Sequence, residues 1–187
     1  MAEKPFFNNQ FLVAMPQLLD SNFNHTVTLL CEHNDQGALG LIINRPTDLK
    51  LVDMLEHMKL GHAAIDERSD IVFWGGPVQQ ERGFVVHEGP SRWDSSLQVG
   101  DDLFITTSRD VLDAIGRGEG PKRFFVALGY AGWGAGQLET EILDNSWLNT
   151  PVNRPILFET PAPDRWQAAT RLLGVDVTQL AGDAGHA

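Results

Sequence analysis

The chain has 187 residues, of which 42% are hydrophobic and 21% charged, a composition typical of one globular domain. It lacks both an apolar run of the roughly 18 to 20 residues that span a bilayer and the pattern of a signal peptide, so we expect a cytoplasmic protein without a membrane segment. A formal net charge of −11 argues against direct nucleic-acid binding, which draws on a basic surface.

The first part of the chain predicts short strands joined by loops. FLVAM at 11–15 is an apolar strand, and VTLLC at 27–31 and LGLIIN at 39–44 are two further strands joined by a loop that contains Gly37. A helix is expected over about 48–60, where apolar residues recur on one face.

The remainder predicts strands at 71–74, 83–87, 102–107, 123–129 and 155–159. Helices are expected over about 110–115, about 134–144 and about 164–174, and the small, polar tail from about 175 is expected to be loose. Because strands outnumber helices and some neighbours are joined by hairpin-length loops, we predict a single α+β domain over 1–187, with a mixed sheet and helices outside it.

A glycine-aromatic stretch, GYAGWGAGQLETE, occupies residues 129–141. We predict a strand-to-helix turn from Gly129 to Gly136, a layout typical of anion sites because backbone N–H groups at a helix start attract negative charge. The stretch matches neither the dinucleotide fingerprint nor the P-loop, and packing of small residues is the alternative interpretation. Its candidate binding residues are Gly132, Trp133, Gly134, Gln137 and Glu139.

A second glycine cluster, Gly75-Gly76, follows the strand expected at 71–74. It could present backbone donors to a ligand, with Arg82 as the anion partner and His87 on the next strand. The alternative is a tight turn stiffened by the following proline. We expect the two glycine clusters to lie close together at the edge of the main concavity, with a positive φ at one or more glycines.

Three segments resemble the AlgH/YqgE family of bacterial proteins. They are FLVAMPQLLDSNFNHTVTLLCEHNDQGALGLIINRP (11–46), WGGPVQQERGFVVHE (74–88) and GYAGWGAGQLETEILDNSWL (129–148). The resemblance implies one compact domain with a mixed, branching β-sheet surrounded by helices, in a bacterial cytoplasmic protein. A role as transcriptional regulator is attached to the family name, but most members have no known function and no catalytic residue set comes with the family.

Polar residues at the ends of the 27–31 and 39–44 strands are further candidates. Glu32 and His33, expected in the loop, could form an acid/base pair, whereas Asn44 and Arg45 should lie at the opposite end of the hairpin. The alternative is that these side chains cap backbone groups. Cys31 and His33 are too few to suggest structural zinc, so we expect no metal and no cofactor.

Three functions are consistent with this pattern. The first is a non-enzymatic binding or regulatory domain that recognises a small anionic ligand or a protein partner. The second is an enzyme of unknown reaction that pairs His33 or His87 with Glu32, Glu88 or Glu139 inside a pocket. The third is direct DNA binding by a transcriptional regulator, which the net charge disfavours. The oligomeric state cannot be predicted from these residues.

Overall fold

The computed structural model describes residues 6–16, 18, 20–65 and 71–174, so the predicted loose tail lies outside the described residues. This part of the chain contains the strands β1 (Gln10–Ala14), β2 (Val27–Asn34), β3 (Gly37–Ile42), β4 (Pro46–Lys50), β5 (Ile71–Trp74), β6 (Val78–Glu88), β7 (Ser96–Gly100), β8 (Leu103–Thr106), β9 (Phe124–Gly134) and β10 (Trp147–Pro151). The helices are α1 (Leu51–His57), α2 (Arg109–Gly116), α3 (Gln137–Leu143), α4 (Arg154–Phe158), the 3₁₀-helix η1 (Ala162–Asp164) and α5 (Arg165–Leu172).

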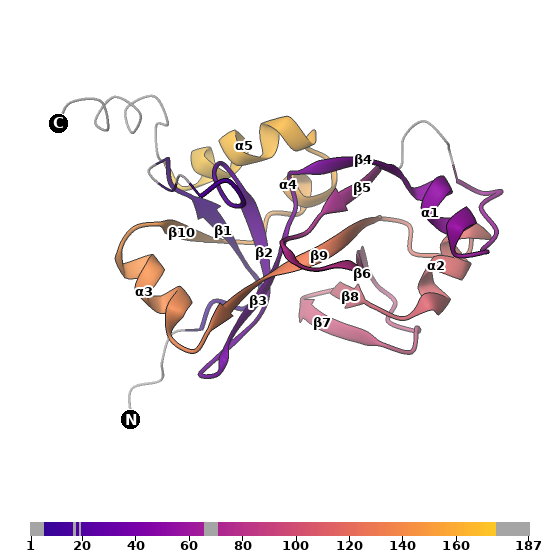
Figure 1. Cartoon of the computed structure of the whole chain (residues 1–187), viewed down its shortest axis with the longest axis horizontal. Helices are drawn as coiled ribbons and strands as arrows, with labels where there is room; N and C mark the ends of the chain where they lie inside the picture. Colours follow the sequence, from indigo (N-terminus) through magenta and orange to yellow (C-terminus); the bar gives the residue numbers. More distant parts are fainter. Residues whose placement is uncertain (1–5, 17, 19, 66–70, 175–187) are drawn as a thin grey trace.

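These strands form one sheet in the order β10-β1-β2-β3-β9-β6-β8-β7, with β5 attached to β9 and β4 attached to β5 (Figure 1). The β5–β9 pair is parallel and the other described pairs are antiparallel. The prediction of an α+β fold with a mixed, branching sheet is therefore confirmed.

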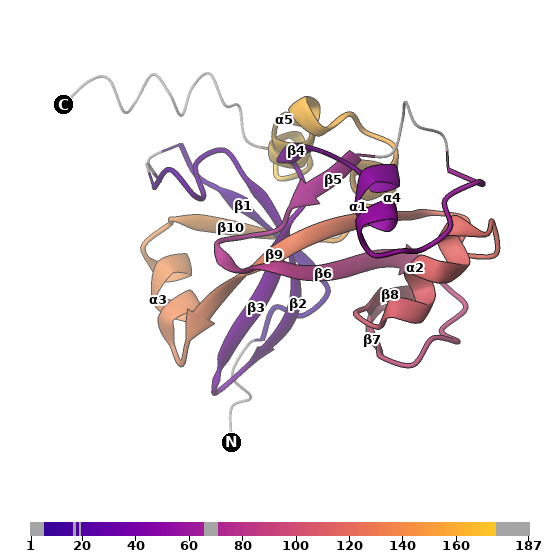
Figure 2. The ribbon, with the colours of Figure 1, turned by 45° about the vertical axis from the view of Figure 1, so that its right-hand side comes forward.

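The long strand β9 is where the sheet branches (Figure 2). Residues 131–134 of β9 pair with β3, whereas residues 124–128 and Tyr130 pair with β6, and Ala127 and Leu128 also pair with β5. We call β10, β1, β2 and β3 the β3 arm, and β6, β8 and β7 the β6 arm. Gly129 lies between the two paired halves of β9.

The glycines at this branch point allow three backbones to come together. Gly129 has a φ of +79°, and a β-carbon added to Gly76 would lie 2.1 Å from the carbonyl carbon of Tyr130. The Gly75 amide donates to the carbonyl oxygen of Leu128, and its own carbonyl accepts from the Ile42 amide. Side chains at these positions would collide with backbone, so the expected proximity of the two glycine clusters and the expected positive φ are confirmed.

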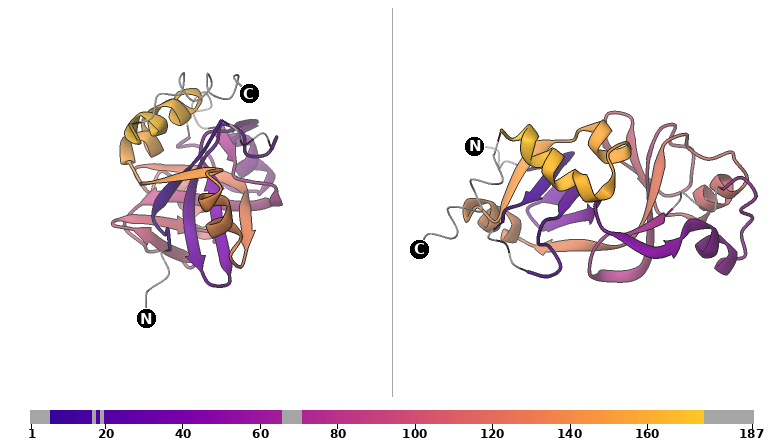
Figure 3. Two further views of the ribbon diagram at one scale, coloured as in Figure 1. Left: turned by 90° about the vertical axis from the view of Figure 1, so that its left-hand side faces the viewer. Right: turned by 90° about the horizontal axis from the view of Figure 1, so that it is seen from above.

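The helices lie around the outside of the sheet (Figure 3). Helices α4 and α5 contribute Ile156 and Trp166 to the hydrophobic core cluster that contains residues of both arms. Helices α1 and α2 pack against the strands around β5, with Leu55 and Ile115 in a second cluster. Helix α3 covers the end of the β3 arm through Leu138, which is fully buried.

One predicted element is wrong, and several predicted boundaries differ from the structure. Residues 155–159 were expected as a strand, but α4 forms there because the Asn153 side chain accepts a hydrogen bond from the Ile156 amide, and Pro155 is tolerated at a helix start. The helix predicted from about 48 begins at Leu51, since the residues before it pair with β5.

The predicted strand-to-helix turn at 129–136 is also wrong in its extent. Strand β9 continues to Gly134, which pairs with Gly37, and α3 begins only at Gln137. The reversal of chain direction is confined to Ala135 and Gly136, where Gly136 has a φ of +74°. The glycine-aromatic stretch is thus chiefly the end of a long paired strand, and the helix N-terminus that motivated the anion-site interpretation lies beyond it.

Candidate functional site

Two adjoining cavities form a groove between the β3 arm and the β6 arm. The first, of about 370 Å³, lies between residues of β2 and β3 on one side and residues of β6, β7 and β8 on the other. The second, of about 520 Å³, extends over the β2–β3 hairpin to Tyr130, Gly132 and Trp133 of β9. Glu32 and Leu39 line both cavities, so they form one continuous concavity, which we call the inter-arm groove.

A β-bulge in β2 presents two consecutive side chains to the groove. Leu30 pairs with Gly40 and Glu32 pairs with Leu39, so Cys31 is the extra residue. Successive strand residues ordinarily point to opposite faces, but a bulge re-aims them, and both Cys31 and Glu32 line the groove. Glu32 was expected in a loop; the structure instead places it within β2.

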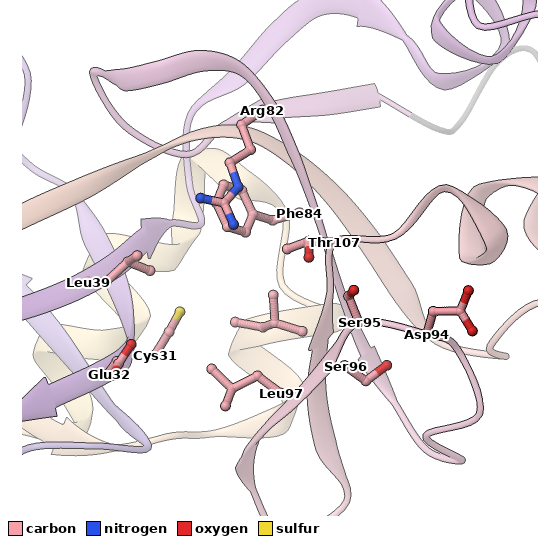
Figure 4. A pocket seen from close by; sticks show the side chains of 11 residues that line it. Cys31, Glu32, Leu39, Arg82, Phe84, Asp94, Ser95, Ser96, Leu97 and Thr107 are labelled. Carbon is pink, nitrogen blue, oxygen red and sulfur yellow. The ribbon is translucent and has the colours of Figure 1, made fainter.

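The opposite wall carries the cationic side chain of Arg82 and several hydroxyl groups. Arg82 lies over the ring of Phe84, with 5.2 Å between the guanidinium carbon and the ring centroid, and it is exposed. Figure 4 shows Arg82 and Phe84 together at one end of the cavity, Cys31, Glu32 and Leu39 on one side, and Ser95, Ser96 and Thr107 on the other.

The charges in the groove are mixed. Arg82 faces a cavity that Glu32 and Asp94 also line, and all three side chains belong to exposed residues. Since two carboxylates and one guanidinium line the cavity, a strongly anionic ligand would meet repulsion as well as attraction. A group that carries both signs of charge suits this lining better.

The thiol of Cys31 forms an apolar part of the wall. Burial raises the pKa of Cys31 well above its usual value, and the charge of nearby Glu32 raises it further, although a backbone hydrogen bond at Leu41 opposes these effects. The Cys31 Sγ also lies 3.4 Å from the carbonyl oxygen of Leu29, to which it donates. The group therefore remains protonated at neutral pH and is a poor nucleophile.

His33 forms the carboxylate pair that the enzyme hypothesis required, but it does so away from the groove. Its Nε2 lies 2.7 Å from Oε1 of Glu139, and its Nδ1 accepts a hydrogen bond from the Phe7 amide at 3.0 Å. The imidazole is fully buried, with the rings of Phe6 and Phe7 against it. His33 lines neither cavity of the groove, so this pair joins β2 to α3 rather than presenting an acid and a base to a substrate.

His87 is enclosed within the β6 arm. Its Nε2 lies 2.6 Å from the hydroxyl of Thr106 and its Nδ1 lies 2.8 Å from the carbonyl oxygen of Glu88, with the rings of Trp93 and Phe104 on either side. Burial lowers the pKa of His87, although the Glu88 carbonyl and the charge of Asp102 oppose this effect. His87 does not line the groove.

Asn44 and Arg45 lie at the far end of the hairpin from Glu32, as the sequence predicts. The Asn44 side chain accepts from the Val27 amide and donates to the carbonyl oxygen of His25. Arg45 donates to the carbonyl oxygens of Ser21, Asn22 and Asn24. Both side chains therefore hold the 20–25 loop in place, which agrees with the capping interpretation.

The five candidates of the glycine-aromatic stretch divide into two groups. Gly132 and Trp133 line the groove. Gln137 accepts a hydrogen bond from the Gly134 amide at 3.0 Å, which closes the turn, and Glu139 is paired with His33. Gly75 and Gly76 are buried at the branch point. Among all the candidates, the structure brings Glu32, Arg82, Gly132 and Trp133 together in one groove.

Other groove residues were not predicted. The hydroxyl groups of Ser95, Ser96 and Thr107 come from the β7–β8 region, where SLQVG (96–100) was not recognised as a strand. The alternation of polar and apolar residues in this segment is a sequence signal for an edge strand. Within the described ranges, no group of three or more His, Cys, Asp or Glu side chains is placed to hold a metal ion.

Comparison with known proteins identifies the family of this chain. A family model described as AlgH-like matches residues 11–178. The chain belongs to the AlgH-like family. It is 58% identical to a UPF0301 protein of Thioalkalivibrio sulfidiphilus over 182 residues, 97% of each chain, and 54% identical to one of Methylococcus capsulatus over 186 residues, 99% of this chain and 98% of the other.

Two solved structures share the fold. The solution structure of AlgH from Pseudomonas aeruginosa is 45% identical, covers 100% of this chain and 99% of its own, and superposes with a TM-score of 0.78. Protein DIP2367 of Corynebacterium diphtheriae has the same fold at 19% identity, with a TM-score of 0.74, covering 96% of this chain and 94% of its own. In the described part of this AlgH-like chain, every helix is too short or too polar to cross a bilayer.

Proposed function

We propose that this AlgH-like protein is a non-enzymatic binding domain of the bacterial cytoplasm, and that its inter-arm groove holds an extended segment of a partner protein. The observation that carries this proposal is the continuous concavity between the arms, with Arg82 on one wall and Glu32 on the other. An acidic side chain of the partner pairs with Arg82, and a basic one pairs with Glu32 or Asp94.

The form and lining of the groove favour a polypeptide over a small anion. Its two cavities share Glu32 and Leu39 and together extend from β7 to the end of β9, which suits an elongated occupant. Leu97 is 49% exposed and Val78 is 36% exposed, and these two residues line the two cavities, where they can contact apolar side chains. Alternating apolar and charged contacts are typical of peptide recognition, whereas a phosphate would face Glu32 and Asp94 as well as Arg82.

The net charge of the chain bears on the form that a regulatory role can take. A net charge of −11 disfavours contact with DNA phosphates, so regulation through a protein partner is the form of the regulator hypothesis that we retain. The His33–Glu139 pair does not support the enzyme alternative, because His33 is fully buried and neither group lines the groove.

Selection of short random peptides on the immobilised full chain tests the proposal. We expect binders with an acidic and a basic residue separated by apolar positions. Arg82→Glu should lower the affinity of these peptides by about tenfold or more. A peptide whose acidic residue is replaced by a basic one should recover binding to that variant. Lys122→Glu, which reverses an exposed charge outside the groove, is the matched control and should leave binding unchanged.

Two outcomes would contradict the proposal. Peptides that bind the wild type, Arg82→Glu and Glu32→Lys with equal affinity would place recognition elsewhere. A failure to select peptides, together with stabilisation of the chain by phosphorylated metabolites in a thermal-shift screen, would favour a small anionic ligand instead.

A further inference from the structure

A separate cavity lies among β4, β5, β9 and the α4–α5 region. Its volume is about 400 Å³, within the range of small-molecule sites, and it shares no lining residue with the inter-arm groove. Four phenylalanine rings line it, together with one cationic side chain, and these are Phe73, Phe124, Phe125, Phe158 and Arg165. A cavity lined by aromatic rings and one buried cation is the pattern expected of a site for an amphiphilic molecule.

Arg165 is buried without a carboxylate partner among the described residues. Only 6% of the residue is exposed, and its guanidinium lies 5.1 Å from the Phe73 ring centroid and 6.0 Å from that of Phe125. Its Nε donates to the carbonyl oxygen of Thr160 at 2.9 Å, and one terminal nitrogen donates to the carbonyl oxygen of Ile43. Burial lowers the pKa of Arg165 to about 10, so the group is still charged at neutral pH.

These contacts do not neutralise the charge. A guanidinium has five N–H donors, and the two carbonyl oxygens accept from two of them. Carbonyl oxygens and ring faces compensate a buried charge only in part, and a buried charge without a counter-ion is costly. Arg123, which stacks on Phe158 nearby, shows the contrast, because its Nε lies 3.0 Å from Glu88.

A carboxylate is the group that would complete this environment. It can accept two parallel hydrogen bonds from a guanidinium and supplies the one negative charge that Arg165 lacks. A phosphate would bring more than one negative charge to a cavity lined by one cation. The phenylalanine rings would contact a flat apolar body.

We propose that this cavity binds a small monocarboxylate with a flat apolar body, with the carboxylate on Arg165 and the body among the phenylalanine rings. The site is distinct from the inter-arm groove, and its occupant is a small molecule rather than a partner protein. Since Arg165 begins α5 and donates to Ile43, the residue after β3, the ligand would also link α5 to the sheet.

Titration of the full chain with 2-naphthoate tests the proposal. We expect saturable binding by calorimetry and a shift of the Arg165 Nε–H resonance in ¹⁵N spectra. The neutral isostere 2-naphthamide should bind at least about tenfold more weakly, and 2-naphthyl phosphate should not bind more tightly than the carboxylate. Equal binding of the amide, tighter binding of the phosphate, or no saturable binding of 2-naphthoate would overturn the proposal.

Three variants assign the binding to this cavity. Arg165→Gln keeps side-chain N–H donors but removes the charge, and should weaken 2-naphthoate by about tenfold or more. Ala162→Phe fills the cavity while retaining Arg165, and should abolish binding of 2-naphthoate. This variant still tests the location of the site if Arg165→Gln fails to fold. Arg171→Gln, on the exposed side of α5, is the control and should bind as the wild type does. Unchanged binding in Ala162→Phe would overturn the proposal.

Discussion

A β-carbon on Gly75 would lie 2.3 Å from the carbonyl oxygen of Gly129, and one on Gly129 would lie 2.3 Å from the carbonyl oxygen of Gly76. These two glycines, 54 positions apart in the sequence numbering, therefore fix how closely β5 approaches β9. The branch of the sheet depends on that approach, and the branch in turn separates the two arms that enclose the groove.

Replacing Gly129 by alanine should destabilise the fold strongly. The backbone φ of +79° costs an L-residue about 1 to 2 kcal/mol, and the contact with Gly76 adds an overpacking cost of about 1 to 3 kcal/mol. Gly136→Ala is the matched control, since Gly136 has a φ of +74° but nothing within 4 Å of an added β-carbon. Urea unfolding should show the larger loss for Gly129→Ala, and equal losses would disprove the steric argument.

Sequence patterns predicted the fold class well because burial is periodic. The apolar strands predicted at 27–31 and 71–74 lie within or coincide with observed strands, and the one predicted at 11–15 overlaps β1 except at Met15. Strand β4 and the extension of β9 to Gly134 were missed, since they are defined by pairing with distant strands rather than by their own composition. The glycine content indicates a turn at a place where the structure has a paired strand, whose glycines allow neighbouring backbones to approach closely.

The candidate site could be predicted only in part for a related reason. The sequence indicates Gly132, Trp133, Glu32 and Arg82 as candidate binding residues, but their assembly depends on the bulge at Cys31 and on the branch at Gly129. Neither feature has a local signature. The pairing of His33 with Glu139, which are 106 residues apart, likewise depends on where α3 lies over the β3 arm.

The buried His87 should make stability depend on pH. Its pKa is lowered in the folded state, so the unfolded chain binds a proton first, at about pH 6.5, and the free energy of unfolding falls as the pH decreases below that value. The contribution of His87 can reach about 1.4 kcal/mol per pH unit. Urea unfolding at pH about 7.5 and about 5.5 should therefore show a smaller loss for His87→Gln than for the wild type.

His57 provides the control for that measurement, because it is exposed on α1. The variant His57→Gln should keep the pH dependence of the wild type. A pH dependence that is the same in His87→Gln and in the wild type would show that other groups account for the acid sensitivity.

The His33–Glu139 contact should be structural. Because Nδ1 accepts from the Phe7 amide, the neutral imidazole carries its proton on Nε2 and donates it to Glu139. Glu139→Ala leaves this buried donor without its acceptor and should lower the free energy of unfolding by about 1 to 3 kcal/mol. Glu81→Ala, at an exposed position, should change it by less than about 0.5 kcal/mol. A hydrogen on Nδ1 in ¹⁵N spectra of His33 would contradict this arrangement.

Cys31 should react slowly in the folded protein even though it lines the groove. The thiolate is the reactive form, and burial raises the pKa of Cys31, so little thiolate is present at mildly alkaline pH. Unfolding in urea exposes the thiol and returns its pKa to the ordinary value.

Since the chain has one cysteine, mass spectrometry after iodoacetamide treatment reports on this residue alone. We expect labelling of the folded chain to be slower than that of the unfolded chain by at least about tenfold, a difference of about 1.4 kcal/mol. Equal rates would show that the folded protein exposes and ionises the thiol as readily as the unfolded chain does, which would contradict the effect of burial on its pKa.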